Sequence, residues 1–97
     1  MKTMNRPLAK SDKIKLSRLR QNIDAIDLEI VHLLNKRALY ALKTGMIKKS
    51  AGIGVYDRTR ERQVFERVQR LNKGLLGEAA IRSIYRSIIS ACRARQK

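Results

Sequence analysis

The residues of this sequence that could do chemistry are cations, one carboxylate and one amide. His32 is the only histidine and Cys92 the only cysteine. A metal site built from histidine and cysteine needs more ligands than these two, and a nucleophile needs an activating base beside it. The remaining candidates lie on helical faces that are otherwise apolar, and they are Arg20, Arg37, Lys48, Arg60, Glu61 and Gln96. Such a set can bind an organic dianion without a metal or cofactor and can stabilise negative charge as it develops.

The stretch from Leu16 to about Lys49 is predicted to form one long helix that carries three of these cations. It contains no proline, and its only glycine is Gly45. Apolar residues from Leu19 onward recur at alternating spacings of four and three, the period of one helical face. About 34 residues at 1.5 Å each give roughly 50 Å, which exceeds the size of a compact chain this short. We therefore expect the helix to pack along a second copy or another partner.

Two of the cations share one face of this helix. Arg37 occupies a position of the apolar stripe, and Lys48 follows it after about three turns. A buried guanidinium is costly unless it is paired, although an arginine on an imperfect stripe can also extend to water. The return of Lys48 to the same face favours an anion bound inside the protein.

Two shorter helices are expected to carry the other candidates, and no strand is expected. A loop with two glycines, residues 50–56, separates the long helix from the second one. Asp57 is a good N-cap for that second helix, which carries Arg60 and Glu61 in its first turn. The sequence therefore predicts an all-α fold of three helices, one long and two shorter.

The third helix is expected to run from about Glu78 to Arg95. Its apolar stripe continues through Cys92 to Gln96. Residues 1–13 are polar and basic and are interpreted as a flexible tail, which leaves residues 14–97 as a single domain. Ser11 or Asp12 could instead cap an earlier start of the long helix.

Composition limits the class of partner. The chain of 97 residues has a net charge of +15, from 23 Lys and Arg against 8 Asp and Glu. This balance favours an anionic partner. No apolar run approaches the length of a membrane span, so no membrane partner is expected. The single cysteine suits a reducing compartment, and we expect a cytoplasmic protein.

The sequence resembles the all-helical (AroQ) class of chorismate mutases over roughly residues 16–96. Four segments carry the resemblance. Residues 19–27 match the family's LR..ID.ID opening, residues 33–37 its LL..R signature, residues 55–61 its V.D..RE segment, and residues 88–96 its II..S...Q ending. The resemblance implies an intertwined homodimer, a helical bundle in which the long helices pair and each of two sites uses both chains.

The resemblance also implies roles at the charged end of chorismate. Arg37 and the partner's Arg20 would bind the two carboxylates, because an arginine fork matches a carboxylate in two hydrogen bonds. The spacing agrees, since Arg20 lies about 25 Å from Arg37 along one helix and cannot reach the same small molecule. Lys48 would contact a carboxylate and the ether oxygen, and Gln96 would donate to that oxygen. The family rearranges chorismate to prephenate within one molecule, so no acid, base or nucleophile is obligatory.

At the other end of the substrate, the resemblance assigns Glu61 to the ring hydroxyl. Asp57 and Arg60 would shape the rim of the site and support that end. The sequence departs from the family pattern at Cys92, where many members have serine, and at Gly54, where many have proline. A thiol is a weak donor, which weakens the expected substrate contact at Cys92.

Three other functions remain open at this stage. A lyase on the same fold removes pyruvate from isochorismate, although Glu61 after Asp57 and Arg60 favours the mutase. A basic helical nucleic-acid binder would suit the net charge. However, the sequence contains no helix-turn-helix or zinc-finger pattern, and aromatic residues for base stacking are scarce. No specific nucleic-acid partner is therefore expected. A non-catalytic dimerisation module is the third alternative.

Overall fold

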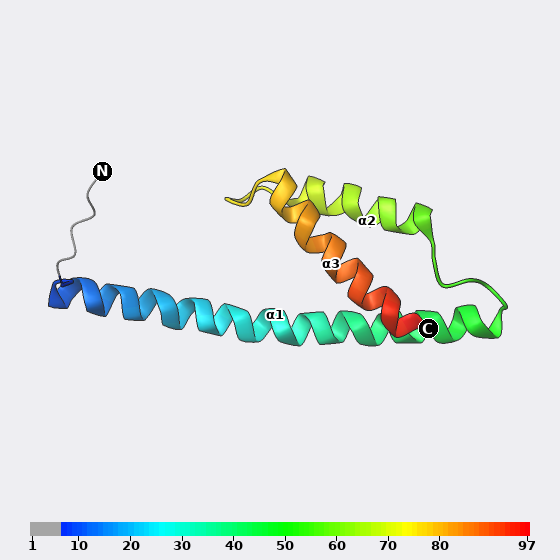
Figure 1. Ribbon diagram of the computed structural model, residues 1–97, viewed down its shortest axis with the longest axis horizontal. Helices are drawn as coiled ribbons and strands as arrows, with labels where there is room; N and C mark the ends of the chain where they lie inside the picture. The colour runs from blue at the N-terminus through cyan, green and yellow to red at the C-terminus, as the bar shows by residue number, and fades with distance from the viewer. Residues whose placement is uncertain (1–6) are drawn as a thin grey trace. The chain divides into compact units, whose positions relative to one another are not determined.

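The chain folds into three α-helices in a computed structural model that describes residues 7–97 (Figure 1). They are α1 (Lys10–Ser50), α2 (Arg58–Leu71) and α3 (Glu78–Gln96), and the described residues contain no strand. This confirms the predicted all-α fold with one long and two shorter helices. By its internal contacts the chain divides into two compact units, residues 1–33 and residues 34–97. The division of the chain into a tail and a single domain of residues 14–97 stays a prediction.

Helix α1 begins earlier than expected. It starts at Lys10 instead of Leu16, and the N–H of Lys13 donates to the carbonyl of Ala9 at 3.0 Å. Asp12 in the first turn complements the positive end of the helix dipole. The predicted flexible tail is therefore wrong for residues 10–13, which are helical, while residues 1–6 lie outside the described part of the chain.

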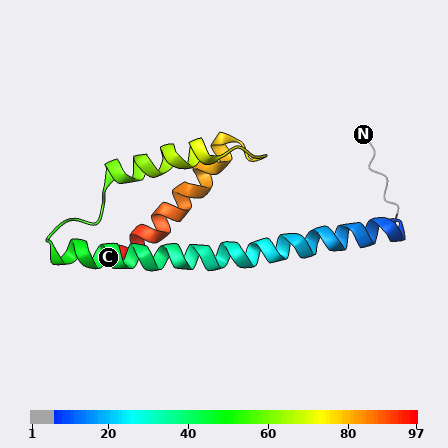
Figure 2. The ribbon, with the colours of Figure 1, turned by 180° about the vertical axis from the view of Figure 1, so that it is seen from behind.

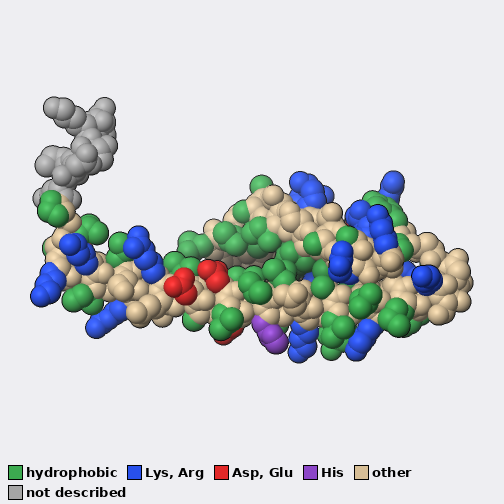
Figure 3. Space-filling view, turned by 60° about the horizontal axis from the view of Figure 1, so that its bottom comes forward, with side chains coloured by type: hydrophobic (Ala, Val, Ile, Leu, Met, Phe, Trp, Pro, Cys, Tyr) green, Lys and Arg blue, Asp and Glu red, His purple; other side chains and the backbone are tan. Residues whose placement is uncertain are grey.

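The part of α1 in the first unit leaves its apolar stripe uncovered. Leu19, Ile26 and Leu33 are 60%, 54% and 59% exposed. Uncovered hydrophobic side chains are also visible on the face drawn in Figure 3. A continuous apolar stripe of this kind usually marks an interaction surface. Packing along a second copy remains the prediction for this stripe.

The second unit is held together by the packing of α2 against α3. The chain reverses direction through residues 72–77, which join the two helices (Figures 1 and 2). Their shared core consists of buried Val64, Val68 and Ile89, surrounded by Phe65, Ile81 and Tyr85. The 3.6-residue period places these apolar side chains on the facing sides of both helices.

The N-terminus of α2 is fixed by the predicted cap. Asp57 has an extended backbone, and its Oδ1 accepts a hydrogen bond from the N–H of Arg60 at 2.9 Å. This bond satisfies one of the N–H groups that the first turn leaves without an intrahelical acceptor. The cap therefore fixes the residue at which α2 begins, and with it the places of Arg60 and Glu61 in the first turn of the helix.

Gly45 allows the end of α3 to approach α1 within the second unit. It is the buried residue of α1, and a Cβ added to it would lie 2.6 Å from the Cα of Gln96 and 2.7 Å from its carbonyl oxygen. A glycine inside a helix costs about 1 kcal/mol relative to alanine. The close approach of the two backbones gives a physical reason for this glycine.

Candidate active site

The second unit contains a cavity of about 410 Å³ between the C-terminal part of α1, the loop before α2, the start of α2 and the end of α3. This volume is in the range of small-molecule sites. Seven of the eight predicted site residues line it: Arg37, Lys48, Asp57, Arg60, Glu61, Cys92 and Gln96. The eighth, Arg20, lies exposed in the first unit and is not part of the lining.

The cavity lining is strongly positive. Five of its residues are Lys or Arg, while Asp57 and Glu61 are its two acidic residues. Arg37 and Lys48 are half-buried, as their places on one face of α1 predict. A cavity that carries this excess of positive charge favours a ligand with more than one negative charge.

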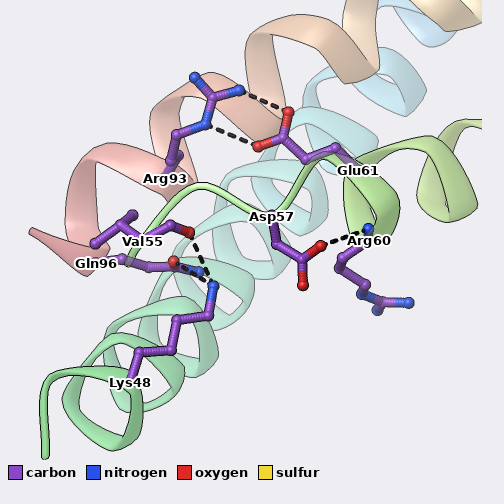
Figure 4. A network of polar contacts seen from close by, with 7 residues as sticks. All are labelled: Lys48, Val55, Asp57, Arg60, Glu61, Arg93 and Gln96. Carbon is purple, nitrogen blue, oxygen red and sulfur yellow. Dashed lines mark hydrogen bonds and ion pairs between the residues drawn. The ribbon is translucent and has the colours of Figure 1, made fainter. Parts of the chain in front are cut away.

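Lys48 is held at the junction of α1, the loop and α3 (Figure 4). Its Nζ donates to the carbonyl of Val55 at 2.9 Å and to Oε1 of Gln96 at 3.1 Å. An ammonium group has three N–H donors, so the third can serve a ligand in the cavity. The two protein contacts fix the position of the charge before any ligand arrives.

Gln96 is oriented by the same contact. Because its Oε1 accepts from Lys48, its amide NH₂ group remains as the donor for a ligand. The close approach at Gly45 brings this last turn of α3 against α1. The structure therefore places the Lys48 ammonium and the Gln96 amide side by side, and their roles toward a ligand remain a prediction.

Glu61 accepts hydrogen bonds from Arg93, a residue that was not predicted to belong to the site. Nε of Arg93 donates to Oε2 of Glu61 at 2.8 Å, and Nη2 donates to Oε1 at 2.6 Å (Figure 4). The Arg93 guanidinium also lies 4.4 Å from the ring centre of Tyr56. The hydrogen bonds to Glu61 raise the pKa of Arg93 above its ordinary value. A single spatial cluster thus joins α2, α3 and the loop.

The remaining predicted residues of the lining differ in exposure. Asp57 and Arg60 are exposed, as expected for residues of a rim. The Cys92 side chain is buried, with 6% of the residue exposed. A buried thiol contributes mainly packing to the cavity wall.

Two cations of the lining, Arg67 and Arg93, were not singled out from the sequence. Helical spacing contained a signal for both. Arg67 lies three residues after the buried Val64, and Arg93 lies three residues before Gln96, so each shares a face with a residue already recognised. An arginine at such a position is also a common surface residue, and the spacing alone does not separate the two cases.

Two further findings concern metals and membranes. Within residues 7–97, no three His, Cys, Asp or Glu side chains lie together as metal ligands would. In the same part of the chain, no helix has the length and apolar character needed to cross a membrane.

Most of the chain is similar to known proteins of one family. The family model described as chorismate mutase type II matches residues 19–97. A bifunctional chorismate mutase/prephenate dehydratase of Aquifex aeolicus is 45% identical over 87 residues, which cover 86% of this chain and 24% of the relative. The chain thus spans about a quarter of the length of that relative.

Two shorter proteins are similar as well. A chorismate mutase of Methanocaldococcus jannaschii is 36% identical over 59 residues, which cover 61% of this chain and 60% of that protein. The solved structure of a Thermus thermophilus chorismate mutase (form II) superposes with a TM-score of 0.82 at 24% identity. It covers 84% of this chain and 93% of that structure. This structural likeness supports the three-helix fold.

Proposed function

The chain belongs to the type II chorismate mutase family, and from this premise we propose that it rearranges chorismate to prephenate. One observation carries the proposal: a single positively charged cavity collects all of the predicted site residues that one chain was expected to supply. These residues come from α1, α2, the loop before α2 and α3. Their convergence is the arrangement that binding a small dianion requires.

The proposed reaction breaks a carbon–oxygen bond and forms a carbon–carbon bond within one molecule. No proton is transferred and no covalent intermediate with the protein is formed. The residues contribute by holding the substrate in its folded conformer and by placing donors where the ether oxygen gains negative charge. We assign that second role to the third N–H of Lys48 and to the amide of Gln96.

Substrate binding in this proposal divides between the two ends of the molecule. Arg37 binds one carboxylate from within the cavity. Glu61 accepts a hydrogen bond from the ring hydroxyl, while Asp57 and Arg60 form the rim beside it. Cys92 contributes the shape of the wall. The excess of positive charge in the lining offsets the two negative charges of chorismate.

We further propose that the working form is a homodimer in which the partner's Arg20 completes each site. Arg20 belongs to the exposed part of α1, next to the uncovered Leu19 and Ile23. Covering this apolar stripe with a second copy would remove it from water. A cytoplasmic location is part of the same proposal, because a buried lone Cys92 suits a reducing compartment.

The proposal is tested by following the loss of chorismate absorbance and identifying prephenate as the product. Arg37→Ala should abolish most of the conversion, because a carboxylate loses its bidentate partner. Lys36→Ala is the matched control, since Lys36 is the exposed neighbour on α1 and does not line the cavity. A folded helical protein that converts no chorismate would overturn the proposal, and release of pyruvate from isochorismate would replace it with the lyase.

A further inference from the structure

The contact between Arg93 and Glu61 is the part of the site that the proposed function leaves unexplained. Both terminal oxygens of the carboxylate accept from the guanidinium, at 2.8 Å and 2.6 Å. The two side chains are partly buried, with 30% of Arg93 and 19% of Glu61 exposed. Such a two-bond fork fixes the plane of a carboxylate as well as its position.

Arg93 is itself held by a third element. Its guanidinium lies 4.4 Å from the centre of the Tyr56 ring, a distance typical of a cation–π contact. Tyr56 belongs to the loop before α2, Glu61 to α2 and Arg93 to α3. The fork therefore ties these three parts of the second unit together at the cavity wall (Figure 4).

We propose that Arg93 is a positioning residue that orients the Glu61 carboxylate for the ring hydroxyl of the substrate. This inference rests on the proposed function. Each carboxylate oxygen can accept two hydrogen bonds. Arg93 occupies one site on each oxygen, which leaves the other for the hydroxyl.

The alternative for a cation in this lining is direct contact with a substrate carboxylate. The two roles predict different substrate dependence. If Arg93 acts through Glu61, its removal matters only for a substrate that carries the hydroxyl. If Arg93 binds a carboxylate itself, its removal is equally harmful for a substrate without the hydroxyl.

The test compares wild type and Arg93→Met with chorismate and with an analogue that lacks the ring hydroxyl. We expect kcat/KM for chorismate to fall on the order of tenfold to a hundredfold and the two proteins to differ little with the analogue. Arg93→Lys should recover only part of the loss, because an ammonium group is a point charge and not a planar fork. Arg95→Met is the matched control, since Arg95 is exposed on the same helix and outside the lining.

A second measurement needs no activity. In the free wild-type protein, NMR of ¹⁵N-labelled arginine should show a slowly exchanging Nε–H of Arg93 that is lost in Glu61→Ala, which removes the acceptor. Three results would each overturn the inference. They are an unchanged kcat/KM of Arg93→Met with chorismate, an equal fall in kcat/KM with both substrates, and a rapidly exchanging Nε–H of Arg93 in the wild type. A wild-type protein without mutase activity would instead overturn the proposed function, while the NMR result would still report on the fork.

Discussion

Replacing Gly45 by alanine should damage activity far more than stability. The new Cβ would lie 2.6 Å from the Cα and 2.7 Å from the carbonyl oxygen of Gln96. Ordinary contacts between carbon atoms are about 3.5–4.0 Å, so the last turn of α3 has to retreat by about 1 Å. Both obstructing atoms belong to the backbone, and a change of side-chain rotamer therefore cannot relieve the clash.

The retreat breaks the contact that positions Gln96. Its Oε1 lies 3.1 Å from Nζ of Lys48, and a further 1 Å exceeds the range of a hydrogen bond. Losing a donor to a developing negative charge costs about 10²–10³ in kcat. Overpacking costs about 1–3 kcal/mol, while alanine regains about 1 kcal/mol of helix propensity. The net loss of stability is then about 0–2 kcal/mol. It stays low because the last turn of α3, at the end of the helix, can fray and so relieve the clash.

The assay is the loss of chorismate absorbance, together with thermal unfolding followed by circular dichroism. Gly74→Ala serves as the control, because no atom lies within 4 Å of a Cβ added there and the residue is outside the site cavity. A Gly45→Ala protein that keeps full kcat and gains stability would refute the reasoning. That result would mean that the end of α3 does not press against α1 at Gly45.

Other substitutions and conditions test separate parts of the site. Lys48→Met should lower kcat by about 10² or more, while Lys49→Met, on its exposed neighbour, should leave kinetics unchanged; an equal effect of both would argue against the assignment. Ile26→Glu should dissociate the proposed dimer in light scattering, because a charge replaces part of the apolar stripe; an intact dimer would exclude that stripe as the interface. Cys92→Ser should lower KM a few-fold, because a hydroxyl donates more strongly than a thiol; an unchanged KM would leave the residue a purely packing role. Raising salt from 0.05 to 0.5 M should raise KM, because ions screen attraction between a dianion and a cationic cavity; a constant KM would mean that the positive charge does not contribute to binding.

The helices themselves were largely predictable, because helix formation depends on residues three and four positions apart. The apolar period located α1, α2 and α3, and the short-range hydrogen bond from Arg60 to Asp57 matches the predicted cap. The start of α1 at Lys10 was left open, because Ser11 and Asp12 can cap a helix but no apolar stripe begins there. Polar residues in a helix that lacks an apolar stripe have the same sequence pattern as a solvated tail.

The sequence by itself determined the three helices, the excess of positive charge and the faces on which Arg37, Lys48 and Gln96 lie. Only the tertiary structure decided which side chains meet. The bond between Lys48 and Gln96 joins residues 48 apart in the chain, and the fork between Glu61 and Arg93 joins residues 32 apart. Local periodicity contains no information on such pairs, because it fixes directions around one helix axis and not the approach of another helix. Gly45 illustrates the difference. A side chain is excluded there by the backbone of Gln96, and the two residues are neighbours only in the folded protein.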